Sequence, residues 1–376
     1  MSDATPTEFD AIEREAMAGA LAASLRGSPS PNPPVGAAVV RDGEVVAFGH
    51  HRRAGEDHAE VVALRGAGER ARAATLFVTL EPCNHVGRTA PCTEAILRAG
   101  VRRVVFAVRD PNPNVAGHGA RALAAAGVEV REGFGGALQR EAERVLAPWG
   151  RFITLGRAHV TLKAGLSLDG AMATRGGESQ WITSEEARRD AHALRGGCDA
   201  VIAGIGTVRA DDPLLTVRGV DAPRRPVRVI LSTGAELPLG SRLVATARDV
   251  PVWLLCGEGG DAAQREREAA LAAAGVDVLR LPRRDGRVDL ASALRALGSR
   301  GVVSALAEGG SAVHGALVDA GLADRVVLYL APMLLGGGGL RAIGGAGPER
   351  LAEALRLGPL DVRRVGPDLR VEGEVR

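Results

Sequence analysis

Three side chains in the first third of the chain have the types and spacing of ligands for a catalytic metal ion. His58 occurs in "DHAEVVALRGAG", and Cys83 and Cys92 occur in "EPCNHVGRTAPC". Imidazole and thiolate groups are common zinc ligands, and three of them leave a fourth position open to water, as in catalytic zinc sites. Cys92 stands at the start of a predicted helix, where the helix dipole favours the thiolate. We therefore predict one Zn2+ per chain, held by these three residues.

A carboxylate follows the histidine at a spacing that suits proton transfer. The order His-x-Glu, Pro-Cys and a second Cys is typical of zinc deaminases, which makes Glu60 the candidate catalytic residue. In that chemistry zinc lowers the pKa of its water to ~7, and the glutamate passes the water proton to the leaving ammonia. The usual deaminase pair is Cys-x-x-Cys, whereas eight residues separate Cys83 from Cys92. His85 and Arg88 in this longer loop are suited to bind a carbonyl or phosphate group.

The same residues have structural interpretations. Asp57 and Glu60 also fit a helix-capping arrangement, with Asp57 as N-cap and Glu60 at the third helical position. His85 could replace His58 as a ligand, or complete a four-ligand structural site. The two remaining cysteines, Cys198 and Cys256, stand alone in apolar, strand-like settings, and we interpret them as core residues.

Hydrophobic periodicity and turn signals predict a layered α/β domain around these residues. Asp42-Gly43 is a strong hairpin signal. The domain is expected to close near Pro148-Trp149-Gly150, which gives domains at 1–150 and 151–376. The predicted helices are Glu8–Arg26, a helix from about His58, Thr93–Ala99 and Ala116–Ala126, and the predicted strands are Val35–Val40, Glu44–Phe48, Thr75–Leu80, Arg103–Val108 and Val128–Arg131.

In the second part of the chain, predicted strands and helices alternate again. The stretch "GGSAVHG" lies between a predicted strand and a predicted helix, so its free amides can hold a phosphate. No dinucleotide-binding fingerprint supports a cofactor, because Arg209 replaces the third glycine in "GIGTVR". The predicted strands are Val160–Ala164, Ala200–Ala203, Val227–Leu231, Val252–Cys256, Val276–Leu279 and Val302–Ala307, and the predicted helices are Ser184–Leu194, with Ser184 as N-cap, and Ser311–Ala320.

Composition excludes several classes of partner. The chain has 376 residues, 46 % hydrophobic, 3 % aromatic, and a formal net charge of +2. Scattered arginines and scarce aromatics do not make a nucleic-acid surface, and no apolar run of ~18 residues predicts a membrane span. The polar start "MSDATPTEFDAIERE" lacks the regions of a secretory signal. We expect a cytoplasmic protein that forms a homo-oligomer and acts on a small molecule.

Longer motifs resemble one family along nearly the whole chain. "PNPPVGAAVVRDGEVV", "HAEVVAL", "TLEPCNHVGRTAPC" and "RDPNPNVAGHG" are followed in order by "LKAGLSLDGAMA", "ESQWITSEEAR", "GTVRADDPLLTVR" and "AEGGSAVHGALV". This combination resembles the bifunctional riboflavin biosynthesis deaminase–reductases. The resemblance implies an α/β chain, in which a cytidine-deaminase-like three-layer domain precedes a dihydrofolate-reductase-like α/β domain.

The resemblance also implies two reactions and their residues. The first domain would remove an amino group from a phosphorylated diaminopyrimidinone by hydrolysis, and the second would use NADPH to reduce the ribosyl group to a ribityl chain. Asn32 would hold the pyrimidine edge. The matching cofactor positions are Gly165, Trp181, Thr207, Asp211, Ser232, Gly310, Ser311, Ala312, Val313, His314, Gly315 and Ala316, and the matching substrate positions are Ser179, Arg195, Leu215, Arg218 and Glu308.

Two of these positions have a direct physical interpretation. Arg195 and Arg218 can grip a substrate phosphate through bidentate hydrogen bonds. Without the resemblance, surface salt bridges would explain both arginines. Two rival functions also stay open at this point: a nucleic-acid base deaminase with an accessory domain, and a binding module with a structural zinc whose fourth ligand is His85.

Overall fold

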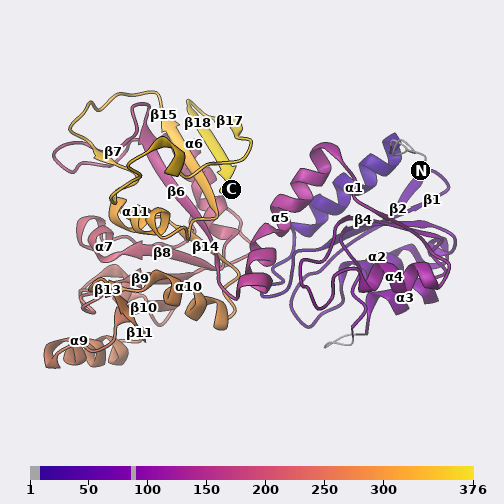
Figure 1. The fold of residues 1–376 in the computed structure, drawn as a ribbon, viewed down its shortest axis with the longest axis horizontal. Helices are drawn as coiled ribbons and strands as arrows, with labels where there is room; N and C mark the ends of the chain where they lie inside the picture. Colours follow the sequence, from indigo (N-terminus) through magenta and orange to yellow (C-terminus); the bar gives the residue numbers. More distant parts are fainter. Residues whose placement is uncertain (1–8, 86–89) are drawn as a thin grey trace. The chain divides into compact units, whose positions relative to one another are not determined.

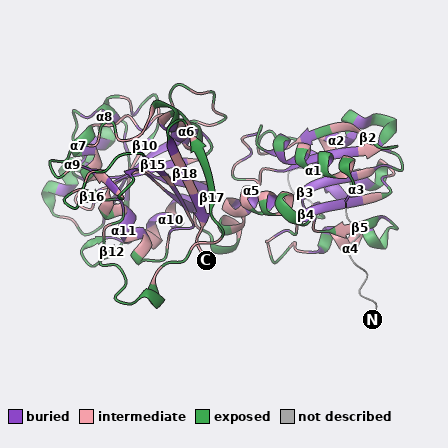
Figure 2. Ribbon diagram, turned by 90° about the horizontal axis from the view of Figure 1, so that it is seen from above, coloured by how far each residue is buried: buried purple, intermediate pink, exposed green. Residues whose placement is uncertain are grey.

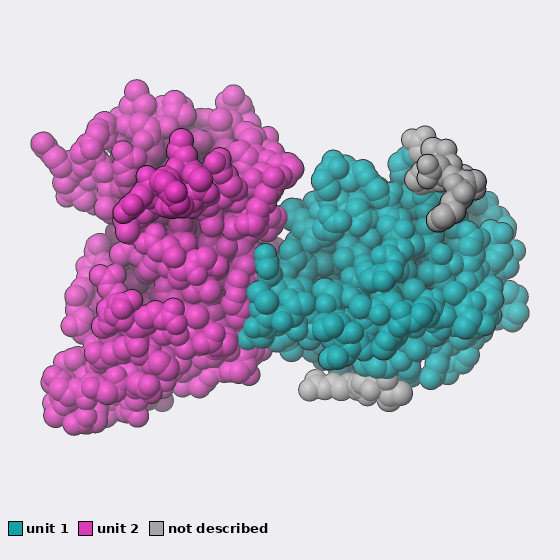
Figure 3. All heavy atoms as spheres, viewed as in Figure 1, with its two compact units in different colours: residues 1–156 teal, residues 157–376 magenta. Residues whose placement is uncertain are grey.

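The chain divides into two compact units, which the computed structural model describes over residues 9–85 and 90–376. The units are Met1–Gly156 and Arg157–Arg376 (Figure 3). This division differs from the boundary expected near Gly150, because α5 (Gly136–Leu155) continues through Pro148. Its buried face of Ala142, Leu146 and Trp149 keeps the helix in place, and Gly156 ends it at φ 63°, a left-handed conformation that favours glycine.

A five-stranded mixed sheet forms the centre of the first unit. Its order is β2-β1-β3-β4-β5, with β1 antiparallel to β2 and β3, and with β3, β4 and β5 parallel. The β1–β2 hairpin turns at Asp42-Gly43, where both residues have positive φ, as the sequence predicted. The strands are β1 (Gly36–Arg41), β2 (Glu44–His50), β3 (Thr75–Leu80), β4 (Arg103–Val108) and β5 (Glu129–Glu132).

Helices cover both faces of this sheet and make the predicted three layers (Figure 1). On one face α1 (Ala11–Ser24) packs beside α5 against β1 and β3. On the other face α2 (Ala59–Ala67), α3 (Cys92–Arg98) and α4 (His118–Ala125) form a row. The strands between these layers are largely buried, as Figure 2 shows for β3 and β4. The layer of α2 and α3 carries the predicted zinc ligands.

A nine-stranded sheet forms the second unit. Its order is β11-β10-β9-β8-β14-β6-β15-β18-β17, parallel from β11 to β15, with β18 and β17 antiparallel at one edge. After β8 the chain adds β9, β10 and β11 one after another towards one edge of the sheet. It then returns and forms β14 between β8 and β6. Ligands bind beyond the carboxyl ends of strands at such a reversal of strand order.

The sequence predicted six of the seven parallel strands of this sheet, but it did not predict the last three strands along the chain. These three are β15 (Arg325–Ala331), β17 (Asp361–Val365) and β18 (Asp368–Glu374). The other strands are β6 (His159–Ser167), β8 (Ala200–Gly204), β9 (Val227–Leu231), β10 (Val252–Gly257), β11 (Asp277–Leu281) and β14 (Ser304–Ala307), with short pairs β12 (Arg283–Arg284) with β13 (Arg287–Val288), and β7 (Ala171–Ala173) with β16 (Leu340–Arg341).

Helices of the second unit follow most of its strands. Ser184 caps α6 by accepting a hydrogen bond from the backbone N–H of Ala187, as the sequence predicted. In the part of the chain that the structure describes, no helix is long and apolar enough to cross a membrane. The helices are α6 (Glu185–Gly196), α7 (Ile205–Asp211), α8 (Arg242–Ala245), α9 (Ala262–Ala273), α10 (Leu290–Ser299) and α11 (Ser311–Asp319).

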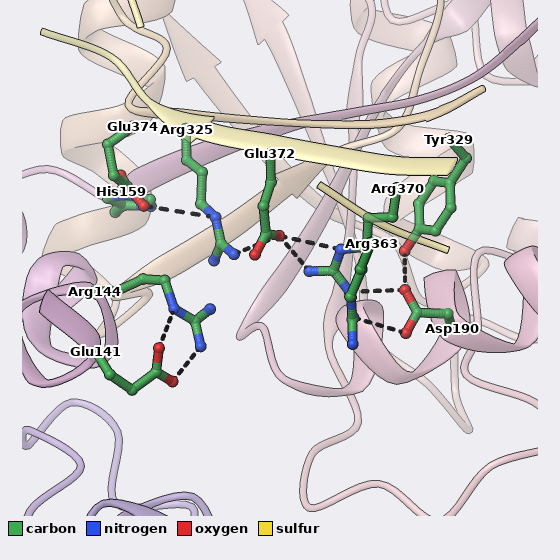
Figure 4. Close-up of polar contacts among 10 residues, drawn as sticks. All are labelled: Glu141, Arg144, His159, Asp190, Arg325, Tyr329, Arg363, Arg370, Glu372 and Glu374. Atoms are coloured by element: carbon green, nitrogen blue, oxygen red, sulfur yellow. Dashed lines mark hydrogen bonds and ion pairs between the residues drawn. The ribbon is translucent and has the colours of Figure 1, made fainter. Parts of the chain in front are cut away.

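Charged side chains fasten α6 to the antiparallel edge of this sheet (Figure 4). Asp190 of α6 accepts hydrogen bonds from the Tyr329 hydroxyl at 2.6 Å and from Arg370 at 2.7 Å. Arg370 also donates to Glu372, which pairs with Arg325 at 2.7 Å. Arg363 of β17 also donates to Asp190 at 3.1 Å. Because Asp190 is tied to three strands, the rest of α6, including Arg195, is held in a fixed position relative to the sheet.

Candidate active sites

The three predicted zinc ligands lie together in the first unit. His58 immediately precedes α2, Cys83 follows the end of β3, and Cys92 opens α3. The His58 Nδ1 atom lies 3.2 Å from the Cys92 sulfur and 3.6 Å from the Cys83 sulfur. Ligand atoms that share a tetrahedral zinc ion lie roughly 3.3–3.8 Å apart, so the donor set fits this metal.

The surroundings of the two thiols favour metal binding. Hydrogen bonds from Cys92 and His58 hold the pKa of the Cys83 thiol well below its usual range. The neighbouring Cys83 and burial raise the pKa of the Cys92 thiol. The hydrogen bond with Cys83 raises the pKa of His58. One shared thiol proton would explain this pattern, and zinc binding would release it, because both sulfurs bind the metal as thiolates.

Glu60 lies beside this cluster and is only 3 % exposed. Burial is the main cause that raises the pKa of its carboxyl to about 7, and the neighbouring Cys83 raises it further. Cys92 forms a hydrogen bond with the carboxylate. A buried carboxyl next to a metal-ligand set can both take and return a proton near neutral pH.

The structure decides the two alternatives for these residues. The N-cap of α2 is His58, without a side-chain hydrogen bond, so the capping interpretation of Asp57 and Glu60 is wrong. Asp57 instead pairs with Arg65 at 2.6 Å. His85 is exposed, and among the described residues the metal-ligating cluster at this position contains only the three predicted ligands. Arg88 lies outside the described residues.

Two residues that the sequence did not single out position this site. Glu81 is buried at the end of β3, and its carboxylate accepts backbone hydrogen bonds from Gly117 at 2.9 Å and Ala120 at 3.1 Å. These bonds fix the segment that leads into Cys83. His51 is 2 % exposed, and its ring lies edge-on to that of His58 with centroids 5.0 Å apart.

Asn32, the predicted pyrimidine contact, lies next to His51. The Asn32 amide nitrogen is 3.0 Å from His51 Nε2, and His51 Nδ1 is 3.0 Å from the Asp57 carbonyl oxygen. Burial lowers the pKa of His51, which favours a neutral ring. A neutral ring that donates from Nδ1 accepts at Nε2, so the Asn32 amide donates to it and its oxygen stays available.

Two cavities open at the strand reversal of the second unit. The first, here called the Ser232 cavity, has a volume of about 830 Å³ and includes five of the predicted cofactor positions besides Ser232 itself. The second, the Glu308 cavity, has a volume of about 530 Å³. Thr207 lines both, so a ligand that fills the first can reach the second. The five positions are Thr207, Gly310, Ala312, Val313 and Ala316.

All five predicted substrate positions of this unit line the Glu308 cavity. They are Ser179, Arg195, Leu215, Arg218 and Glu308, together with the predicted cofactor positions Gly165, Trp181, Thr207 and Asp211. Trp181 is 65 % exposed, and the guanidinium of Arg188 lies over its ring at 4.4 Å. Trp181 is therefore available to a ligand and does not belong to the core.

The remaining predicted cofactor positions have other environments. Ser311, His314 and Gly315 are not among the residues that line either cavity. Both ring nitrogens of His314 lie within hydrogen-bonding distance of backbone oxygens, 3.0 Å from that of Ala307 and 3.1 Å from that of Ala342. The side chain of His314 therefore holds α11 in place and does not point into the Ser232 cavity.

The Glu308 cavity contains a basic residue that the sequence analysis missed. Lys163 on β6 lies 3.5 Å from Glu308, and it is the only lysine in the chain. A single lysine in a chain that otherwise uses arginine was the available signal. Burial opposes ionisation of Glu308, but the charges of Lys163 and Arg195 outweigh it and hold the pKa of this carboxyl below its usual range.

The contacts of Arg195 favour a positioning role over the phosphate contact that we predicted for it. It is 9 % exposed, and its Nε and Nη2 atoms donate to the two Glu308 oxygens at 2.7 and 2.8 Å. It also donates to the Thr216 carbonyl oxygen, so few donors remain for a phosphate. Arg218 is exposed, and its only side-chain hydrogen bond in the described chain is to the Thr216 hydroxyl at 3.3 Å. Arg218 is the better candidate for the phosphate.

Glycines make the Ser232 cavity suitable for a phosphate-bearing cofactor. Gly310, which precedes α11, has φ 64°, and a Cβ there would lie 3.2 Å from the Thr207 hydroxyl. A Cβ at Gly204 would lie 2.7 Å from Val313. The backbone at the start of α11 is therefore open to close approach, and its free N–H groups favour an anion.

Comparisons with known proteins identify the family of each unit. Residues 11–108 match the family described as the cytidine and deoxycytidylate deaminase zinc-binding region, and residues 158–371 match the RibD C-terminal domain. The riboflavin biosynthesis protein RibD of Bacillus amyloliquefaciens is 42 % identical over 352 residues, which cover 93 % of this chain and 92 % of that protein. The chain belongs to the RibD family.

Solved structures give the same result. RibD of Acinetobacter baumannii aligns with a TM-score of 0.82 at 37 % identity, covering 96 % of this chain and 98 % of that one. The diaminohydroxyphosphoribosylaminopyrimidine deaminase/5-amino-6-(5-phosphoribosylamino)uracil reductase of Thermotoga maritima aligns with a TM-score of 0.81 at 33 % identity, with the same coverage. The chain is thus a bifunctional enzyme of riboflavin biosynthesis, with a zinc deaminase domain and a reductase domain of the NADPH-dependent type.

Proposed function

We propose that the first unit removes the amino group of 2,5-diamino-6-ribosylamino-4(3H)-pyrimidinone 5′-phosphate by hydrolysis. The position of the buried Glu60 beside His58, Cys83 and Cys92 is the observation that carries this proposal. Zinc would be held by these three residues and would supply a water acidified towards neutral pH. Glu60 would accept a proton from the attacking water and deliver it to the departing nitrogen, so that C–NH2 and water become C=O and ammonia.

Other residues of the first unit would hold the pyrimidine. Asn32 presents its amide oxygen as an acceptor for a ring or amino N–H, and the hydrogen bond with His51 fixes its orientation. The binding energy of the ring is then used to bring the amino-bearing carbon to Glu60.

We propose that the second unit reduces the ribosyl group of the deaminated product to a ribityl chain. The residues that line the Ser232 cavity would hold NADPH, which would supply a hydride to the sugar C1′ carbon. Lys163 and Glu308 face the sugar in the adjoining cavity, where Lys163 can donate to a sugar oxygen and Glu308 can accept from a hydroxyl. Arg195 holds Glu308, and Arg218 binds the 5′-phosphate.

Product identification tests both proposals together. Zinc-loaded protein is incubated with the diaminopyrimidinone phosphate, with and without NADPH, and the products are weighed by mass spectrometry. Without NADPH the amino group should be replaced by oxygen and nothing further should change. With NADPH the same product should gain two hydrogens. Reduction of the diamino compound without deamination would contradict the proposed order.

Three further expectations stay predictions: a homo-oligomer, a cytoplasmic location and no nucleic-acid partner. Light scattering of the purified protein tests the first. An RNA-binding titration over a range of salt concentrations tests the last, because binding to phosphates weakens steeply with salt.

A further inference from the structure

A short hairpin places two arginines side by side at the edge of the Ser232 cavity. Arg284 on β12 and Arg287 on β13 are paired directly across the hairpin. Asp285 and Gly286 form the two-residue turn, with φ values of 50° and 72°, which is the geometry that Asp-Gly favours between antiparallel strands. Directly paired residues project from the same face of a hairpin, so the two guanidinium groups share one face.

This pair is unfavourable without a ligand. Like charges directly opposite each other destabilise a hairpin, and both arginines are exposed at the rim of the cavity. Arg284 has one weak partner, since its Nε lies 3.5 Å from the Asp289 carboxylate. No ion pair or side-chain hydrogen bond involves Arg287 in the described part of the chain. An anion between the two side chains would relieve their repulsion.

Hydrogen bonds hold the hairpin at the mouth of the cavity. The backbone N–H of Val288 donates to the Thr233 hydroxyl at 3.2 Å, and that of Asp289 donates to the Pro282 carbonyl oxygen at 2.9 Å. Thr233 follows Ser232 directly after β9, and both line the cavity. The arginine pair is therefore attached to the carboxyl end of β9, away from the start of α11 at Gly310.

The neighbouring residue Arg283 points elsewhere. Its guanidinium donates to the Gln264 side chain at 2.8 Å, and it is not among the residues that line the cavity. Successive side chains of a strand point to opposite faces, so Arg283 has a structural role and Arg284 faces the cavity.

We propose that Arg284 and Arg287 bind the 2′-phosphate of NADPH and make this enzyme prefer NADPH to NADH. The inference rests on the Ser232 cavity as the cofactor site. A dinucleotide whose pyrophosphate lies at the start of α11 carries its adenosine towards β9 and the hairpin. Arginine is suited to a phosphate there, because its planar guanidinium donates in bidentate geometry. The Asp289 carboxylate competes for Arg284, which makes Arg287 the more important of the two.

Matched ligand pairs test this proposal by binding alone. Affinities for NADPH and NADH, and for adenosine 2′,5′-bisphosphate and 5′-AMP, are measured by calorimetry. Arg287→Ala should weaken NADPH and the bisphosphate by about 10-fold, the size of one charge-assisted hydrogen bond, and Arg284→Ala should weaken them less. NADH and 5′-AMP should bind to both variants as they do to the parent protein.

Two control variants sharpen the result. Arg283→Ala removes the same charge from the other face of the hairpin, and it should leave the preference unchanged. Asp285→Asn removes the nearest carboxylate in the turn while keeping a residue that tolerates positive φ, and it should favour NADPH slightly.

Other outcomes would overturn the proposal. Equal losses of affinity for NADPH and NADH in Arg287→Ala would mean that the arginine pair binds the pyrophosphate. Unchanged affinities for all four ligands would mean that the arginine pair does not contact the cofactor. Failure of the parent protein to bind NADPH at all would instead overturn the cofactor site itself.

Discussion

Cys83 and Cys92 differ in what surrounds their sulfur atoms, and both must lose a proton before they bind zinc. Hydrogen bonds stabilise the thiolate of Cys83, whereas burial and the neighbouring Cys83 oppose ionisation of Cys92. Cys92 is 1 % exposed. Serine at either position removes a thiolate from a three-ligand set, so metal binding depends on both.

We predict that Cys83→Ser and Cys92→Ser largely lose the one zinc ion that each parent chain holds. Metal analysis of the purified proteins measures this. Cys198→Ser is the matched control, because Cys198 is buried in the second unit and donates a hydrogen bond to the Leu194 carbonyl oxygen. Full zinc retention in both ligand variants would contradict the assignment.

The contacts of Arg195 and Arg218 predict different results for their removal. Arg218→Ala should weaken binding of the phosphorylated substrate by roughly 1.5–3 kcal/mol, because it removes a charge-assisted hydrogen bond. Arg195→Ala should also lower the melting temperature, because it leaves the buried Glu308 without its main partner. Calorimetric titration of substrate and thermal unfolding separate the two effects. Equal stability of both variants would contradict the positioning role of Arg195.

His192 should make the stability of the second unit depend on pH. Burial first, and then Arg195 and Arg218, lower its pKa from 6.5 to about 4. The unfolded chain therefore binds more protons than the folded chain between these values, and stability falls as the pH drops from 6.5 towards 4. His192→Asn should lose less stability over this range. Melting temperatures of the parent and the variant across the range test this, and identical pH profiles would contradict it.

The residue types of the zinc site could be predicted from the sequence, but the network around Glu308 could not. Histidine and cysteine at deaminase spacing indicate their chemistry directly. The role of Arg195 depends on which acceptor reaches it, and Glu308 lies 113 positions further along the chain. Glu81 and His51 were missed for the same reason, since folding brings backbone groups close to both and the Asn32 amide close to His51.

At the scale of elements, the start of α11 is the proposed binding point of the cofactor. Gly310→Val should weaken NADPH binding by at least 10-fold, because the new side chain would crowd Thr207 and block approach to the helix. Gly321→Val is the matched control at the other end of α11. Gly321 has φ 63° with open space around it, so this variant carries a similar backbone strain without entering the cavity.

Fluorescence titration with NADPH distinguishes the two variants. The control should be destabilised by about 1–2 kcal/mol and bind NADPH normally. If both variants lose NADPH equally, backbone strain and not the cavity explains the loss.

Alternating strand and helix patterns predicted the layers of both units, but some elements were hidden. α5 was missed because Gly135, Gly136 and Pro148 read as helix breakers, although an apolar face buried against the sheet outweighs a local preference. α10 was missed because it lies between two turn-rich segments. β17 lies on the sheet edge and is largely exposed, so it has no hydrophobic alternation to reveal it.

At the scale of the whole molecule, deamination and reduction belong to two separate units of one chain. The metal ligands and Glu60 come only from the first unit, and the residues of the Ser232 and Glu308 cavities come only from the second. Each unit also has its own sheet and core. A change confined to one set of residues should therefore leave the other reaction intact.

Glu60→Gln in the full chain tests this claim most directly. The variant is given the diamino substrate in one reaction, and the deaminated substrate with NADPH in another, and both are followed by mass spectrometry. Deamination should fall on the order of 10²–10⁴-fold, the range for a lost general acid–base group, while zinc content and the rate of reduction stay at the parent level. Loss of both reactions, or deamination at the parent rate with zinc retained, would contradict the account.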